Sequence, residues 1–286
     1  MDPIQVLTFS APVALAALGE SVTQKAGVIH IGLEGTMLAA GYGAMTATYF
    51  SHSPWLGLAM GLVVGLVSAL INGWFCIRLA ADQVVVGAAW NLLALGVTGT
   101  LFRAQFGQTG RLLSVEKVPS LAGLDPVLWF LLLSVPLLTW GLARTGWGLA
   151  LRAVGQAPRS VEAAGWSVER LRMSAMLVGG LFAGLAGAYL SLGIAGSFAE
   201  GMTGGRGFMA IAMVTFGRWK PVGVFFASLL IGAAEAVQYV VQGGAVEVSA
   251  HLLIAVPYVL ALAVLALTGK GSLAPKALGR PYRREG

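Results

Sequence analysis

The stretch that organises this chain is residues 150–172, ALRAVGQAPRSVEAAGWSVERLR. It is the longest polar, charged segment in a sequence of 286 residues that is 57% hydrophobic and only 10% charged. A soluble domain carries about a quarter charged residues, so this composition is typical of a polytopic membrane protein. A simple pore has no need of such an insert between two spans. A membrane protein driven by a soluble partner needs a grip of this kind.

Turn-forming and capping residues inside the insert predict short helices. Pro158 suits the first turn of a helix, and Gly165 suits its C-terminal cap. Ser167 suits the N-cap of a second short helix, 168–172, which runs into the next span. Two short helices at an angle form a compact knob on which a partner can dock. The alternative is an amphipathic helix that lies on the lipid headgroups.

Outward from the insert, apolar runs predict an all-α, polytopic membrane bundle with about 8–10 transmembrane helices, since about 20 apolar residues cross a bilayer. The 207–217 run is too short to cross alone, so we expect it to cross obliquely or to form half of a broken helix. We expect a transmembrane domain over 1–268 and a basic cytoplasmic tail over 269–286 that is solvated or touches headgroups. The expected spans are 4–19, 28–50, 55–77, 83–103, 127–143, 173–196, 207–217, 221–241 and 249–268.

The distribution of Lys and Arg predicts the orientation. With the insert in the cytoplasm and the spans alternating, 14 of the 18 basic residues fall on the cytoplasmic side. This asymmetry follows the positive-inside rule and places the N-terminus outside and the C-terminus inside. The same asymmetry accounts for the net charge of +6 without a nucleic-acid partner. The four basic residues left on the outer side are Arg103, Arg111, Lys117 and Arg206.

The sequence holds no constellation that indicates an enzyme. There is no G-x-x-x-x-G-K-[ST] phosphate-binding loop, so we expect no ATP binding by this chain through such a loop. The three histidines do not cluster, and the single cysteine, Cys76, provides no metal-ligand spacing. We therefore predict no catalytic residues and no metal site.

A resemblance to a known family becomes specific in four places. Residues 155–165, GQAPRSVEAAG, resemble the coupling segment of ATP-binding-cassette importer permeases, in the branch that serves ribose-like sugars, nucleosides and branched-chain amino acids. Residues 25–35 are similar to the nucleoside-permease pattern, except that His30 stands where that pattern usually has Asn. Residues 81–91 and 205–221 resemble the same subgroup. The coupling role carries over to Gly155, Pro158, Arg159, Glu162, Ala163, Ala164 and Gly165.

This resemblance implies a transmembrane subunit in the inner membrane of a bacterium or archaeon. Two such permeases, identical or paralogous, pair in the membrane. Two separate ATPase subunits bind ATP and Mg²⁺ and grip the coupling segments, so no cofactor is expected in this chain. An extracytoplasmic binding protein delivers the substrate, for which the implied class is a nucleoside or a ribose-like sugar. The competing hypothesis is a stand-alone secondary transporter or channel that uses intramembrane carboxylates.

Two carboxylates within apolar runs are candidates for the translocation path, since charge inside a membrane is costly. Glu34 follows a glycine-rich break and either faces the path, pairs with Lys25, or caps the start of its own helix. Glu235 lies in mid-span, where it either lines a pore or bonds to another helix, and Gln238 is its nearest neighbour on the same helix.

Amides and one indole complete the candidate path. Asn72, Gln83 and Asn91 can read ribose hydroxyls or base edges, or can join helices to one another. Trp90 can stack on a base or serve in packing. Glycine-rich breaks at 27–35 and 204–217 fall in opposite halves of the chain, as inverted repeats around a central site would place them.

Overall fold

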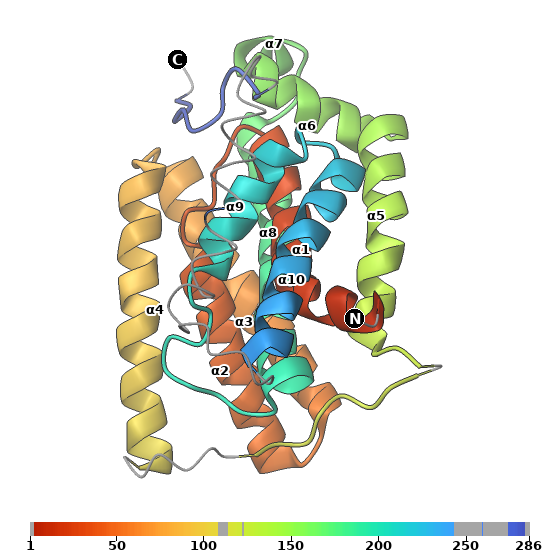
Figure 1. Cartoon of the computed structure of the whole chain (residues 1–286). Helices are drawn as coiled ribbons and strands as arrows, with labels where there is room; N and C mark the ends of the chain where they lie inside the picture. Colours follow the sequence, from red (N-terminus) through yellow and green to blue (C-terminus); the bar gives the residue numbers. More distant parts are fainter. Residues whose placement is uncertain (1–2, 108–113, 122, 243–258, 260–273, 284–286) are drawn as a thin grey trace.

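The computed structural model describes residues 3–107, 114–121, 123–242, 259 and 274–283. The described chain folds as one bundle of helices, with α7 and the C-terminal segment at the same end (Figure 1). The elements are α1 Pro3–Lys25, α2 Leu33–Ser51, α3 Pro54–Gly73, η1 Trp74–Arg78, α4 Gln83–Phe106, α5 Pro126–Arg144, α6 Gly146–Gln156, α7 Pro158–Ala163, α8 Val168–Tyr189, η2 Leu190–Ala195, α9 Arg206–Phe216 and α10 Pro221–Gln242.

The predicted polytopic helical bundle is confirmed. Among the described residues, five helices are long and apolar enough to cross a membrane. They are Pro3–Lys25, Pro54–Arg78, Gln83–Phe106, Pro126–Arg144 and Val168–Ala195. Helices α2, α9 and α10 pack among these five. The expected span 249–268 lies outside the described residues, apart from residue 259.

The boundaries of α1 and α2 differ from the sequence prediction, whereas α9 agrees with it within one residue. Helix α1 continues to Lys25 instead of ending at 19, because its polar last turns are satisfied inside the bundle. Helix α2 begins at Leu33, since residues 26–32 are not helical. Helix α9 has 11 residues. At 1.5 Å per residue it is about half as long as a bilayer core is thick, so it matches the predicted half of a broken helix.

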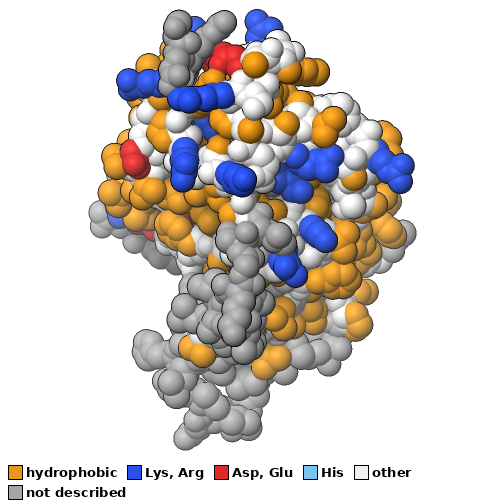
Figure 2. All heavy atoms as spheres, turned by 90° about the horizontal axis from the view of Figure 1, so that it is seen from above, with side chains coloured by type: hydrophobic (Ala, Val, Ile, Leu, Met, Phe, Trp, Pro, Cys, Tyr) orange, Lys and Arg blue, Asp and Glu red, His pale blue; other side chains and the backbone are white. Residues whose placement is uncertain are grey.

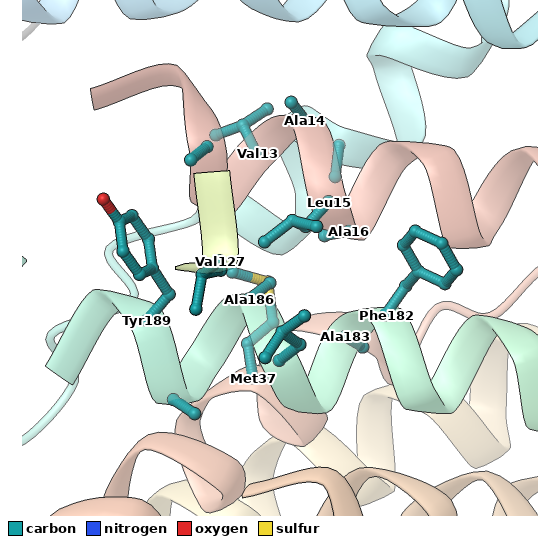
Figure 3. Packing of buried hydrophobic residues seen from close by; sticks show 14 of the residues in the cluster. Val13, Ala14, Leu15, Ala16, Met37, Val127, Phe182, Ala183, Ala186 and Tyr189 are labelled. Carbon is teal, nitrogen blue, oxygen red and sulfur yellow. The ribbon is translucent and has the colours of Figure 1, made fainter. Parts of the chain in front are cut away.

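The core lies where α1 and α8 cross at the centre of the bundle. Leu15 and Ala16 of α1 face Phe182, Ala183 and Ala186 of α8 (Figure 3). Both helices are buried along most of their length, whereas α4 exposes most of its surface. Exposed apolar side chains on α3 and α4 fit a surface that faces lipid or another membrane subunit.

Small residues set the spacing between helices. A Cβ placed on Gly65 of α3 would overlap the carbonyl oxygen of Gly180 in α8, and a Cβ on Gly187 of α8 would overlap the carbonyl oxygen of Met37 in α2. The glycine stripes of α3 and α8 are therefore packed against each other within this chain. This is the close backbone approach that small residues permit in membrane helices.

The insert lies at one end of the bundle and comprises the end of α6, the short helix α7 and the start of α8. Its first part belongs to α6, an amphipathic helix that the sequence analysis did not predict. Pro158 begins α7 and Gly165 ends it at a φ of +86°, as predicted. The Ser167 hydroxyl accepts a hydrogen bond from the backbone N–H of Arg170 at 3.3 Å, which caps α8. The predicted short helix 168–172 is the first part of that long span. Lys and Arg side chains gather over this end of the molecule (Figure 2).

Candidate functional site

The break between α1 and α2 is held by amide side chains of α4. The Gln83 side-chain oxygen accepts from the backbone N–H of Ile29 at 2.8 Å. Asn91 bonds the other end of the break twice, by donating to the carbonyl of Ile31 at 3.0 Å and by accepting from the N–H of Gly35 at 2.8 Å. Non-helical backbone at membrane depth needs such partners, because the bilayer core offers none. The two amides thus join helices, one of the two roles that the sequence left open.

Glu34 joins the two glycine-rich breaks. It lies in the first turn of α2, and its carboxylate oxygens accept from the backbone N–H groups of Gly205 at 2.7 Å and Gly207 at 2.6 Å. The N-cap residue of α9 is Gly205, which has no side chain to cap the helix. Glu34 supplies that cap from another helix and places negative charge at the positive end of the α9 dipole. Among the described residues Glu34 forms no ion pair with Lys25, whereas its place in the first turn of α2 fits the favourable position on its own helix dipole that the sequence also offered.

Arg206 extends this cluster to α10. Its guanidinium lies 3.3 Å from the Glu235 carboxylate, and the two side chains are 26% and 12% exposed. A pair this far removed from water is more strongly coupled than a surface pair. The structure thus gives Glu235 an inter-helix ion pair, whereas the sequence offered Gln238 as its neighbour. It also places Arg206 within the bundle, although the topology count put this residue in an outer loop.

Asn72 and Trp90 lie against the break from opposite helices. A Cβ on Gly32 would come within 2.9 Å of the Asn72 amide oxygen and 3.1 Å of the Trp90 ring. Asn72 is buried and donates to the carbonyl of Ser68. Buried polar atoms without a hydrogen-bond partner in the described chain gather along this break. They are both ring nitrogens of His30, Nε2 of Gln83 and Nε1 of Trp90.

A buried network at the end of α1 was missed by the sequence analysis. The Glu20 carboxylate accepts from Thr23 Oγ1 at 2.6 Å, from Gln24 Nε2 at 2.9 Å and from the backbone N–H of His30 at 3.1 Å. The Gln24 amide oxygen accepts from Trp219 Nε1 at 2.8 Å. The available signal was the spacing of Glu20 with residues three and four positions on, which share one helix face.

The predicted coupling residues differ in exposure. Arg159, Ala163, Ala164 and Gly165 are exposed, and Pro158 and Glu162 are half-buried. Gly155 is buried, and a Cβ there would overlap the carbonyl oxygen of Lys25, so close packing accounts for this glycine. The buried side chain of Val161 anchors α7 to the bundle. The exposed rim of α7 is therefore a fixed surface that a partner can grip.

The described part of the tail is docked on the insert, contrary to the expectation of a solvated end. The backbone N–H of Ala277 donates to the carbonyl of Gly155 at 2.9 Å, and that of Gly279 donates to the carbonyl of Gly27 at 3.1 Å. The Tyr282 hydroxyl donates to the Glu162 carboxylate. Residues 274–283 thus tie the coupling segment to the start of the break.

The geometry of the described residues fits binding between helices. In the part of the chain that the structure describes, no three His, Cys, Asp or Glu side chains come close enough to hold a metal ion. Within the cluster, Glu34 is bonded to the start of α9, and Arg206 and Glu235 are bonded to each other. Such an arrangement can hold two broken segments together, and can release them if its charges are rearranged.

Comparison with known proteins assigns this architecture to transport. The chain is 32% identical to the guanosine ABC transporter permease protein NupQ of Bacillus subtilis, over 99% of this chain and 98% of the relative. It is 31% identical to the nucleoside ABC transporter permease protein NupC of Lactococcus lactis subsp. cremoris, over 97% and 95%. The glucose ABC transporter permease protein TsgB13 of Haloferax volcanii is 27% identical, over 87% and 74%.

A solved structure supports the fold. A metal-chelate type ABC transporter in an inward-facing conformation matches 92% of this chain and 85% of its own, with a TM-score of 0.59 and 14% identity. At this identity the likeness concerns the fold alone. The family of branched-chain amino acid transport system permease components matches residues 3–267. This multi-pass membrane protein therefore belongs to that family, and it is a permease subunit of an ABC transporter with nucleoside-type relatives.

Proposed function

We propose that this chain forms the translocation path for a nucleoside and couples transport to a separate ATPase. The observation that carries the proposal is the cluster in which Glu34 bonds α9 while Arg206 pairs with Glu235. It joins two helix breaks inside the bundle, where transporters place substrate sites. Full-length similarity to guanosine and nucleoside permeases supports a nucleoside over a sugar.

Unpartnered polar atoms beside the cluster fit a polar substrate. Buried donors nearly always find partners, so the Trp90 indole N–H and the His30 imidazole mark places where a ligand or ordered water bonds. An indole and an imidazole also present faces on which a nucleobase stacks. In this proposal a second permease completes the path, an extracytoplasmic binding protein loads it, and the end bearing α7 faces the cytoplasm.

Uptake competition tests the substrate. Cells that express the transporter take up radiolabelled guanosine, and unlabelled purine nucleosides, pyrimidine nucleosides, ribose and a branched-chain amino acid are added in turn. The proposal expects nucleosides to compete and ribose and the amino acid to have no effect. Competition by ribose or the amino acid alone would refute the nucleoside assignment and leave the permease assignment standing.

Uncoupling tests the role of α7. We expect Glu162→Ala and Gly165→Ala to lower uptake strongly while the bundle stays folded. The first variant removes the charged carboxylate of α7. The second strains the backbone at residue 165, where φ is +86°, by about 1–2 kcal/mol. Uptake is compared with ATP hydrolysis by the assembled transporter, and folding is followed by size-exclusion chromatography. Normal uptake by both variants would contradict the coupling role.

A further inference from the structure

A basic cavity lies where the tail crosses the coupling segment. Its volume is about 660 Å³, within the range of about 300–1,000 Å³ that small-molecule sites occupy. The insert supplies Gln156 and Pro158 to its wall, and the tail supplies the opposite side. Five cationic side chains line it, and none of its described lining residues is acidic. The five are Arg159, Arg172, Lys276, Arg280 and Arg283.

Arg172 distinguishes this cavity from an exposed cationic surface, because its guanidinium group is buried. The residue is 1% exposed, at the start of a membrane-spanning helix. Nη1 donates to the carbonyl of Arg280 at 3.1 Å, while Nε and Nη2 have no hydrogen-bond partner among the described residues. A guanidinium buried in this way is costly unless an anion compensates its charge. The cavity beside it is the place where such an anion fits.

The neighbouring cavity provides a contrast. It measures about 460 Å³ and shares Arg172, Tyr282 and Arg283 with the first. Its remaining wall includes both Glu162 and Glu169, so its charge is mixed. Only the first of these two cavities therefore gathers positive charge without carboxylates of its own.

We propose that this cavity binds a phosphate group. Guanidinium groups match the geometry of phosphate oxygens, and several cations around one small volume can compensate the charge of a phosphate monoanion or dianion. Two sources offer this chemistry at the face proposed to be cytoplasmic. One is the headgroup of an anionic phospholipid, and the other is a soluble phosphomonoester. Occupancy would hold the tail against α7, because the ligand bridges both. The proposal rests on the charge and burial of the cavity and not on the substrate carried.

Binding measurements on the purified full-length chain distinguish the sources. One arm titrates inorganic phosphate and AMP in neutral detergent by isothermal calorimetry, at constant ionic strength. The other reconstitutes the chain in nanodiscs of phosphatidylcholine, with or without phosphatidylglycerol, and quantifies the retained lipid by mass spectrometry. We expect saturable binding in at least one arm.

Three variants locate the site. Arg172→Met should weaken binding at least ~10-fold, since a charge-assisted contact is lost. The surface variant Lys276→Gln/Arg283→Gln carries the same test if Arg172→Met fails to fold. Arg170→Gln is the matched control, because Arg170 is exposed and lines neither cavity. Absence of binding in both arms, or equal binding by all variants, would overturn the proposal. The proposal would also be overturned if Arg172→Met left phosphate and lipid binding unchanged and impaired only the binding of the ATPase subunit.

Discussion

Replacing Glu34 by Gln tests whether the carboxylate holds the two helix breaks together. The carboxylate accepts two backbone N–H groups, at 2.7 Å from Gly205 and 2.6 Å from Gly207. A glutamine has one acceptor oxygen, and its NH₂ group then faces a donor. A hydrogen bond to a charged group contributes about 1.5–3 kcal/mol. The loss of one such bond should therefore lower the free energy of local opening at the start of α9 by a similar amount.

Amide hydrogen exchange measures this release directly. At about 1.4 kcal/mol for each factor of ten, the loss corresponds to roughly 10- to 150-fold faster exchange, provided that α9 opens locally. The peptide covering 203–210 is followed by mass spectrometry in the full-length chain in nanodiscs. Peptides from α8, to which the Glu34 carboxylate makes no hydrogen bond in the described structure, should be unchanged.

The matched control is Glu116→Gln, which removes the same charge at an exposed position outside the helices. Glu34→Asp keeps the charge on a shorter side chain and should fall between wild type and Glu34→Gln. Equal exchange of residues 203–210 in wild type and Glu34→Gln would refute the cap. In that case the cluster would not be the element that joins the breaks.

Further substitutions probe the ion pair, the break and the helix packing. Arg206→Gln and Glu235→Gln should each lower the free energy of unfolding by about 1–3 kcal/mol, because each leaves a partly buried group without its partner. The double variant should lose less than the sum of the two, as a thermal-unfolding cycle will show. Asn91→Ala leaves the N–H of Gly35 and the carbonyl of Ile31 without their partner. It should lower the free energy of unfolding by about 1–3 kcal/mol in the same assay. Gly187→Val should prevent the accumulation of folded protein, because the new side chain overlaps the α2 backbone. Gly96→Ala is the control, since a Cβ at Gly96 meets open space, and it should behave as wild type in expression and size-exclusion chromatography.

Local signals account for the parts of the fold that the sequence predicted correctly. Apolar runs predicted the spans, and the ends of α7 followed from Pro158 and Gly165. The end of α1 was misplaced because the polar run from Glu20 to Gln24 was interpreted as a loop. Those side chains are buried and bonded to each other, which pattern alone does not show.

The contacts of the candidate site could not be predicted, because its partners are distant in sequence. Glu34 and Gly205 are 171 positions apart, and Arg206 and Glu235 are 29 apart. The sequence identified Glu34 and Glu235 as costly charges within apolar runs, which is a property of each residue alone. Which groups offset that cost depends on how the helices pack. The sequence also contained no sign of the docked tail. Its bonds to Gly27 and Gly155 join residues far apart in the chain, and they are made by backbone groups, which every residue carries.

These contacts form one continuous connection between the insert, residues 150–172, and the cluster of Glu34, Arg206 and Glu235. The tail bonds α6 at Gly155 and the break at Gly27. The break is fixed to α4 by Asn91, and Glu34, directly after it, holds α9. A shift of the insert relative to α1 would therefore strain the backbone bonds of the tail at Gly155 and Gly27, and it would also move α8, whose first turn belongs to the insert. The break is non-helical and its backbone groups are held by Gln83 and Asn91, so any change of its conformation requires these bonds to be exchanged for others.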